Sequence, residues 1–168
     1  MNLFKASLLA TALVAAGIAA PAHAENNQDF QVLIDIEASC DVISTDDIDF
    51  DTQVAKSGTL NTSGNVVVQC TRDQAYHVQL SGGQTNDVAA REMRNVAGDA
   101  ISYQLYLDSA RTKTWGETKG TDTASGTGTG FGTGATYDQA HTVFATATLT
   151  GTERVGAYSD TVKATVTF

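Results

Sequence analysis

The sequence has almost no proline, few basic residues and no hydrophobic run long enough to cross a membrane. Its 168 residues include one proline, Pro21, two cysteines, and 10 basic residues against 19 acidic ones. A chain with this excess of negative charge and no basic cluster repels phosphate, which argues against nucleic acid and anionic membrane surfaces as partners. The longest apolar run, residues 8–20, is too short for a transmembrane helix.

Residues 1–24 have the composition of a secretory signal peptide. They contain no acidic residue and one lysine, Lys5, ahead of the apolar run, and they end on the small-x-small pattern Ala22-His23-Ala24. Signal peptidase cuts after such a pattern. Removing these 24 residues leaves 144 residues without proline, with nine basic and 19 acidic residues and therefore a net charge of −10. We expect one secreted domain of this size.

The two cysteines, Cys40 and Cys70, are predicted to form a disulfide. The signal peptide directs the chain to an oxidising compartment, where disulfides form. A metal site would require further cysteine or histidine ligands beside the pair, and the sequence has no such cluster. A bridge that closes about 30 residues stabilises a fold by roughly 3–4 kcal/mol in the chain-entropy model.

The alternation of apolar and polar residues with a period of two predicts an all-β sandwich. Short runs rich in Thr and Val are separated by Gly, Asn, Asp and Ser clusters, while helical periodicity is almost absent. Residues 87–95 are the only segment compatible with a helix. Residues 116–137, rich in Gly, Thr and Ser, predict a long mobile loop because they offer little apolar surface to bury. The predicted strands are 30–38, 65–70, 76–80, 101–107, 142–150 and 158–168, and the acidic segment 46–51 is a further strand candidate.

The glycine-rich and acidic segments lack the spacing of known ligand sites. The Gly-x-Gly-x-x-Ala pattern of residues 130–135 has no βαβ unit around it, so it does not indicate a dinucleotide site. The alternating aspartates of residues 47–51 lack the glycine and glutamate that an EF-hand loop requires. An acidic strand face, with Ile48 and Phe50 turned to the core, is the better interpretation, and we expect no metal and no cofactor.

No residue pattern indicates catalysis. His77 and His141 lie in alternating runs, and neither has the spacing to a serine or glutamate that hydrolases use. A pair of catalytic carboxylates is a spatial feature that sequence alone does not single out. An extracellular hydrolase therefore stays open as an alternative without positive support, and the chain is predicted not to be an enzyme.

An apolar ladder precedes Cys40. Five polar residues, 25–29, lead directly into Phe30, Val32, Ile34, Ile36 and Ala38, which share one face of an extended chain. This ladder is either the first strand of a self-contained sandwich or a strand offered to another molecule by β-augmentation. An immunoglobulin-like sandwich needs about seven strands, and roughly six are recognisable after Cys40, which favours the second interpretation.

Short motifs follow one another along the whole chain after the signal: Cys40, Phe50-Asp51, Gly64…Val66-Val67-Val68-x-Cys70, Tyr76-x-Val78-x-Leu80, Gly83, Arg91-x-Met93, Ile101-x-Tyr103-x-Leu105-Tyr106 and Gly156-x-Tyr158-x-Asp160-Thr161-Val162-x-Ala164-x-Val166-x-Phe168. This ordered set resembles the spore coat U domain, a family that includes pilin subunits of archaic chaperone–usher pili. One departure is Phe50-Asp51, where many members carry Phe-Gly.

The resemblance implies a sandwich that lacks its last strand and is completed in trans. Residues 1–24 are then the signal peptide, 25–38 the N-terminal donor strand and 39–168 the pilin domain. A periplasmic chaperone lends a strand first, and at the outer-membrane usher the donor strand of the next identical or related subunit replaces it. The implied donor side chains are Phe30, Val32, Ile34 and Ile36. The implied groove edge and chaperone contact comprise Val162, Ala164, Val166 and Phe168.

The implied function is that of a structural subunit, more like a shaft pilin than a two-domain tip adhesin. Such a subunit is secreted through the periplasm and polymerised head to tail into surface pili for adhesion and biofilm formation. The alternative is a self-contained secreted β-sandwich that serves as a coat or ligand-binding protein.

Overall fold

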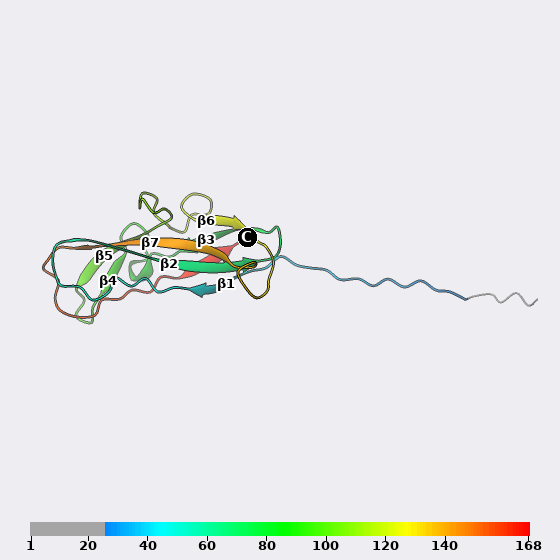
Figure 1. Ribbon diagram of the computed structural model, residues 1–168, viewed down its shortest axis with the longest axis horizontal. Helices are drawn as coiled ribbons and strands as arrows, with labels where there is room; N and C mark the ends of the chain where they lie inside the picture. The colour runs from blue at the N-terminus through cyan, green and yellow to red at the C-terminus, as the bar shows by residue number, and fades with distance from the viewer. Residues whose placement is uncertain (1–25) are drawn as a thin grey trace, which may run out of the picture. The chain divides into compact units, whose positions relative to one another are not determined.

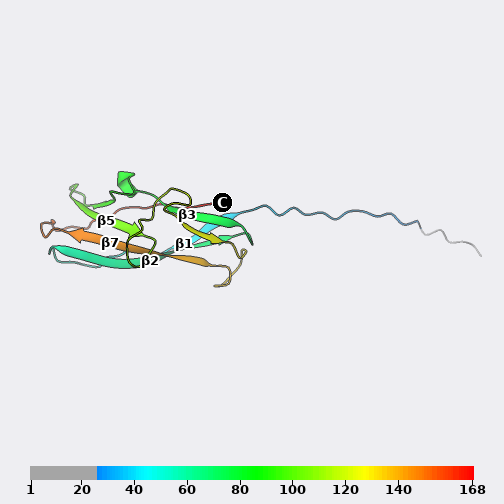
Figure 2. The ribbon, with the colours of Figure 1, turned by 90° about the horizontal axis from the view of Figure 1, so that it is seen from above.

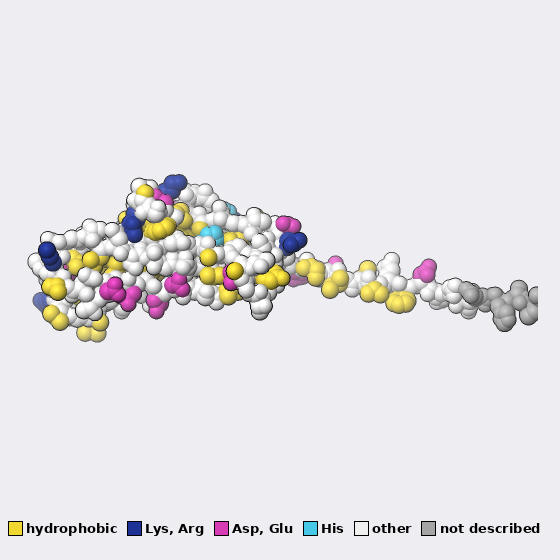
Figure 3. All heavy atoms as spheres, in the orientation of Figure 1, with side chains coloured by type: hydrophobic (Ala, Val, Ile, Leu, Met, Phe, Trp, Pro, Cys, Tyr) yellow, Lys and Arg dark blue, Asp and Glu magenta, His cyan; other side chains and the backbone are white. Residues whose placement is uncertain are grey.

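The computed structural model describes residues 26–168, so the predicted signal peptide lies outside the described residues. The chain divides into a unit that ends at Asp35 and a unit from Ile36 to Phe168. Residues 26–39 form neither helix nor strand, so the prediction of a strand over residues 30–38 is wrong for the chain by itself, where no neighbouring strand pairs with this segment. The ladder side chains of this segment are exposed (82% for Ile34), and Figure 3 shows hydrophobic side chains along it. Within the described part of the chain, no helix has the length and hydropathy to cross a membrane.

The unit from Ile36 onward is built from strands, as the alternation predicted, and residues 26–168 contain no α-helix. One 3-10 turn spans Gly83–Thr85. The strands are β1 (Cys40–Thr45), β2 (Gly58–Cys70), β3 (Ala75–Leu80), β4 (Glu92–Arg94), β5 (Ala100–Tyr106), β6 (Ala124–Thr127), β7 (Gln139–Leu149) and β8 (Ala164–Thr167).

The strands form two antiparallel sheets. One has five strands in the order β1-β2-β7-β5-β4, and the other has three in the order β6-β3-β8. The longest pairing joins β2 to β7, from Gly58 opposite Leu149 to Val68 opposite Gln139, and these strands run side by side in Figures 1 and 2. The disulfide between Cys40 and Cys70 is present, and it joins directly opposed residues of β1 and β2.

The core lies between the facing sides of the sheets. Val68, Val78 and Trp115 are almost fully buried there, and the indole nitrogen of Trp115 donates a 2.8 Å hydrogen bond to the carbonyl of Val78. Alternate residues of β2, β3, β5 and β7 point inward, which is the periodicity that the sequence showed.

The prediction that residues 116–137 form a long mobile loop is wrong in part, because this segment contains β6, which pairs with β3. The small residues make this possible. A Cβ at Gly126 would lie 2.4 Å from the Tyr76 hydroxyl oxygen, so only glycine admits that ring. Further along, the Gln69 side chain binds both the N–H and the carbonyl of Gly132.

Two other expectations are corrected. Residues 87–95 contain no helix, and their last part forms β4, which pairs with β5. The predicted strand 158–168 is a strand only over Ala164–Thr167. Before it, Ser159 makes an isolated bridge to Arg94, and Asp160 turns its side chain toward β5.

Candidate functional site: an open groove between the sheets

Strand β8 is the edge of the three-stranded sheet. It pairs with β3 on one side, from Leu80 opposite Ala164 to His77 opposite Thr167, and no strand of residues 26–168 pairs with its other side. An edge of this kind presents unpaired N–H and C=O groups that an additional strand can bind.

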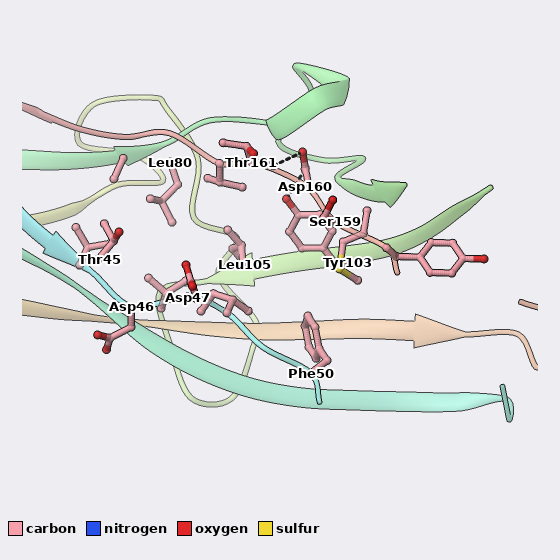
Figure 4. Close-up of a pocket in the computed structure, with 17 residues that line it drawn as sticks. Thr45, Asp46, Asp47, Phe50, Leu80, Tyr103, Leu105, Ser159, Asp160 and Thr161 are labelled. Atoms are coloured by element: carbon pink, nitrogen blue, oxygen red, sulfur yellow. Dashed lines mark hydrogen bonds between the residues drawn. The ribbon is translucent and has the colours of Figure 1, made fainter. Parts of the chain in front are cut away.

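A cavity of about 490 Å³ opens between this region and the other sheet. Figure 4 shows Ser159, Asp160 and Thr161 on one side of it and Asp47 and Phe50 on the other. The cavity reaches into the core, because buried side chains form part of its wall: Val66, Leu80, Leu105 and Val143. The space between the two sheets is therefore open here, with buried apolar side chains in its wall.

One lip of the groove is the segment after β1. Ile48 and Phe50 are half-buried and pack against the core, as predicted, although the segment is not a strand. The Asp46 carboxylate holds it to β2 by accepting hydrogen bonds from the Asn65 backbone N–H at 3.0 Å and the Asn65 side-chain amide at 2.9 Å. Gly64 leaves room for this contact, since a Cβ there would lie 3.0 Å from Ile48 Cδ1.

The other lip is the segment before β8, and it is fixed through Asp160. Its carboxylate accepts hydrogen bonds from the Tyr103 hydroxyl at 2.6 Å and from the Gln84 backbone N–H at 2.9 Å. Burial works against the charged carboxylate, but the hydrogen bonds outweigh it and hold the pKa of Asp160 below its usual value. Burial and the Asp160 charge together raise the pKa of the Tyr103 hydroxyl. Gly83 has φ of 65°, and any Cβ there would collide with this carboxylate.

A fully buried arginine, Arg91, supports the wall of the groove from behind. Its guanidinium donates hydrogen bonds of 2.9 Å to the carbonyls of Ser81 and Leu80, 2.8 Å to the carbonyl of Trp115 and 2.6 Å to Gln104 Oε1. Burial lowers the pKa of Arg91. A buried charge is tolerated when its donors are satisfied, so Arg91 fixes the end of β3 where Leu80 meets the cavity.

The predicted groove-edge residues come together only in part. Val162 and Ala164 line the cavity, and Val166 packs against the core beside them, whereas Phe168 is 52% exposed and lies outside the lining. The role of the predicted donor side chains stays a prediction. The sequence reasoning missed Asp160 and Arg91 as supports of the groove; both occur in the recognised motifs, but nothing in the sequence gave them a role.

Within residues 26–168, the side-chain hydrogen-bond partners of His141 and His77 are a tyrosine and a threonine. His141 is half-buried, its Nε2 lies 2.9 Å from the Tyr76 hydroxyl oxygen, and burial lowers its pKa. His77 Nδ1 lies 3.3 Å from the Thr123 hydroxyl oxygen. Among residues 26–168, no group of three or more His, Cys, Asp or Glu side chains is placed to hold a metal ion.

Comparison with known proteins gives a family match and a fold match. The model of the Spore Coat Protein U domain matches residues 26–165. Protein U of Myxococcus xanthus is 33% identical over 115 residues, which cover 63% of this chain and 59% of that protein.

Among solved structures, a chain of the chaperone–tip adhesion subunit complex CsuC–CsuE, from the archaic chaperone–usher Csu pili of Acinetobacter baumannii, has a similar fold. Its TM-score is 0.55 and its identity 22%, and the match covers 79% of this chain and 40% of that chain. The present chain thus spans less than two thirds of the length of either protein.

Proposed function

This chain belongs to the Spore Coat Protein U domain family, and from that premise we propose that it is a structural subunit of an archaic chaperone–usher pilus. In this proposal, residues 39–168 form an immunoglobulin-like sandwich that lacks its last strand. The subunits polymerise by donor-strand exchange into surface fibres that serve adhesion and biofilm formation.

The observation that carries the proposal is the open groove beside the unpaired edge of β8. The cavity ends on buried core side chains such as Leu80 and Leu105. A strand added to β8 would hydrogen-bond to its free edge and cover this apolar surface, which is how β-augmentation works. Burying one Ile or Val side chain contributes about 1.5–3 kcal/mol.

The segment before Cys40 has the chemistry of the missing strand. Its side chains Phe30, Val32, Ile34 and Ile36 share one face and are 75–85% exposed. The segment contains no proline that would remove a backbone donor. A head-to-tail contact between such a segment and the groove of a second copy does not close on itself, so it generates a fibre.

The proposed partners follow from this assembly. A periplasmic chaperone lends a strand beside residues 162–168, and an outer-membrane usher exchanges it for the segment of the next subunit. The similar fold in the chaperone–subunit complex from Acinetobacter baumannii supports this proposal at the level of the fold. The proposed location is the cell surface, reached through the periplasm.

A pair of substitutions on neighbouring residues tests the donor role. Ile34→Asp places a charge on the apolar face, and Leu33→Asp makes the same change on the opposite face. Fibres and chaperone co-purification are assayed in the native host. We expect Ile34→Asp to abolish fibres while chaperone capture persists, because burying an unpaired carboxylate costs several kcal/mol, and Leu33→Asp to assemble. Normal fibres from Ile34→Asp would refute the proposal.

The family match itself favours a second candidate, a self-contained secreted coat or ligand-binding protein. That candidate requires residues 30–38 to complete the sandwich within one chain. Deleting residues 25–38 separates the two. A pilin without this segment still folds on its chaperone, whereas a self-contained sandwich loses its core packing and the buried environment of Trp115.

A further inference from the structure

We propose that the groove is matched to a second copy of this chain in one register: the segment adds antiparallel to β8, with Asp35 opposite Lys163. This inference rests on the proposed function and adds to it the identity of the partner and the pairing that aligns it.

The register depends on which side chains of each strand face the core and which face away from it. Val162, Ala164 and Val166 pack against the core, so by alternation Lys163, Thr165 and Thr167 lie on the other side of the strand, and Lys163 is exposed. The segment before Cys40 also has two faces, the apolar ladder and a second face of Gln31, Leu33, Asp35 and Glu37. When the ladder faces the core, this second face lies beside Lys163.

The antiparallel register with Asp35 opposite Lys163 pairs the whole ladder with inward residues of the acceptor. The pairs are Ile36 opposite Val162, Ile34 opposite Ala164, Val32 opposite Val166, and Phe30 opposite Phe168. Ile34 and Ile36 thereby reach the part of β8 that borders the cavity, where Val162 and Ala164 line it. The larger Ile34 side chain also meets the small Ala164.

Charge also favours this register over the one that places Leu33 opposite Lys163. Lys163 is the only basic residue between 158 and 168, while the opposite lip of the groove carries the exposed carboxylates of Asp46 and Asp47. Residues directly opposite on neighbouring antiparallel strands have Cβ atoms about 4.5–5.5 Å apart. The Asp35 carboxylate is therefore placed beside the Lys163 ammonium.

Other alignments of the two strands place ladder residues, or Lys163, opposite less suitable partners. A slip of two residues toward the segment's start places Leu33 opposite Lys163 and Ile36 opposite Asp160, whose carboxylate is charged and already bound by Tyr103. The opposite slip places Glu37 opposite Lys163, but only the small Ala38 then faces Val162, and Phe30 lies past Phe168. A parallel strand with Asp35 at Lys163 places Val32 opposite Asp160. Among the antiparallel registers, only the proposed one keeps all four ladder residues on apolar partners; the parallel alignment that also does so places Gln31, which carries no charge, opposite Lys163.

Cysteine cross-linking measures the register directly. We expect full-length Asp35→Cys/Lys163→Cys and Leu33→Cys/Thr165→Cys variants to give covalent ladders of fibre subunits without reductant. Leu33→Cys/Lys163→Cys reports the slipped register, and Leu33→Cys/Thr161→Cys reports the parallel direction. A ladder from either of these, with none from the first two, overturns the inference.

Charge exchange tests the selectivity for a second copy. We expect Lys163→Glu to slow assembly about five- to tenfold, since like charges then face each other, and Asp35→Lys in the same chain to restore it to within about twofold. Lys119→Glu serves as the control, because Lys119 is also exposed and the substitution changes the charge by the same amount. If Lys163→Glu behaves like Lys119→Glu, the inference fails while the Ile34→Asp result still decides the donor-strand function.

Discussion

The hydroxyl of Tyr103 donates a 2.6 Å hydrogen bond to Oδ2 of Asp160, and this bond ties β5 to the segment that leads into β8. Tyr103 is buried, and Asp160 lines the groove. The bond therefore connects the core to the lip along which the proposed donor strand lies. Because the Gln84 backbone N–H binds the same carboxylate, the lip is held in place without an added strand.

Asp160→Asn removes the charge that these donors stabilise, and we expect it to lower the free energy of unfolding at pH 7 by about 1 kcal/mol. The pKa of Asp160 is lowered in the folded chain. Its contribution is therefore present above the ordinary aspartate pKa and is lost as the pH falls through the folded value. The difference in the free energy of unfolding between Asp160→Asn and the unsubstituted chain should therefore become smaller below pH about 4.

Guanidinium unfolding at pH 7 and pH 3, followed by the fluorescence of the single tryptophan, measures this difference. Asp47→Asn is the matched control, since Asp47 also lines the groove but is exposed. A stability loss of equal size at both pH values would contradict the assigned role of the charge.

Arg91→Met should be among the most destabilising single substitutions in this chain, at about 3–5 kcal/mol. Methionine leaves the carbonyls of Leu80, Ser81 and Trp115 without their donor inside the protein. Arg91→Lys recovers only part of the loss, because one ammonium does not span acceptors that a planar guanidinium reaches together.

The control for Arg91 is Arg72→Met, at an exposed residue, which should change stability by no more than about 0.5 kcal/mol. The readout is the unfolding midpoint of the purified chain. Similar midpoints for Arg91→Met and Arg72→Met would show that the Arg91 hydrogen bonds contribute little.

Gln69→Ala is expected to release the glycine-rich segment from β2. The Gln69 amide donates 2.7 Å to the Asp138 carboxylate and 3.1 Å to the Gly132 carbonyl, and its oxygen accepts from the Gly132 N–H at 3.2 Å. Without these bonds, residues 128–138 gain conformational entropy and backbone exposure. Hydrogen exchange at Gly132 should accelerate, while exchange in β7 stays unchanged. Gln79→Ala, at a half-buried residue of β3, is the control.

The sequence predicted β5, most of β7 and the second half of β2, because burial of every second side chain leaves a visible alternation there. Strands β2, β5 and β7 have inward residues at every second position, so period two was visible in each. Strand β6, with the sequence Ala-Ser-Gly-Thr, has no such signal. It pairs with β3 because the Tyr76 ring needs the space at Gly126, a tertiary relationship that no local pattern reveals.

Local sequence patterns also predict the groove only in part. The inward positions of Val162 and Ala164 were readable from alternation, and their packing confirms that orientation. That residues 160–163 would not be a strand was not readable, because it depends on the bonds of Asp160 to Tyr103 and Gln84, far away in the sequence. The buried role of Arg91 was hidden for a related reason, since charged side chains are rarely fully buried.

Asp51→Gly is expected to stabilise the chain by about 0.5 kcal/mol, at the position where the family pattern has glycine. Asp51 has φ of 57°, in the left-handed region that costs side-chain-bearing residues energy. Asparagine and aspartate tolerate it best, and the Asp51 N–H donates 2.8 Å to the Asp49 carboxylate, which offsets part of the cost. Glycine removes the strain but adds entropy to the unfolded chain, so the net gain is small.

The matched control is Asp47→Gly, which removes the same charge at a residue whose φ is not positive. It should destabilise the chain, because only the entropic penalty of glycine applies there. Thermal unfolding of the two variants gives the comparison, with an increase in Tm for Asp51→Gly and a decrease for Asp47→Gly. A decrease for both would mean that Asp51 contributes through its side chain and that its backbone conformation is not the source of strain in this lip of the groove.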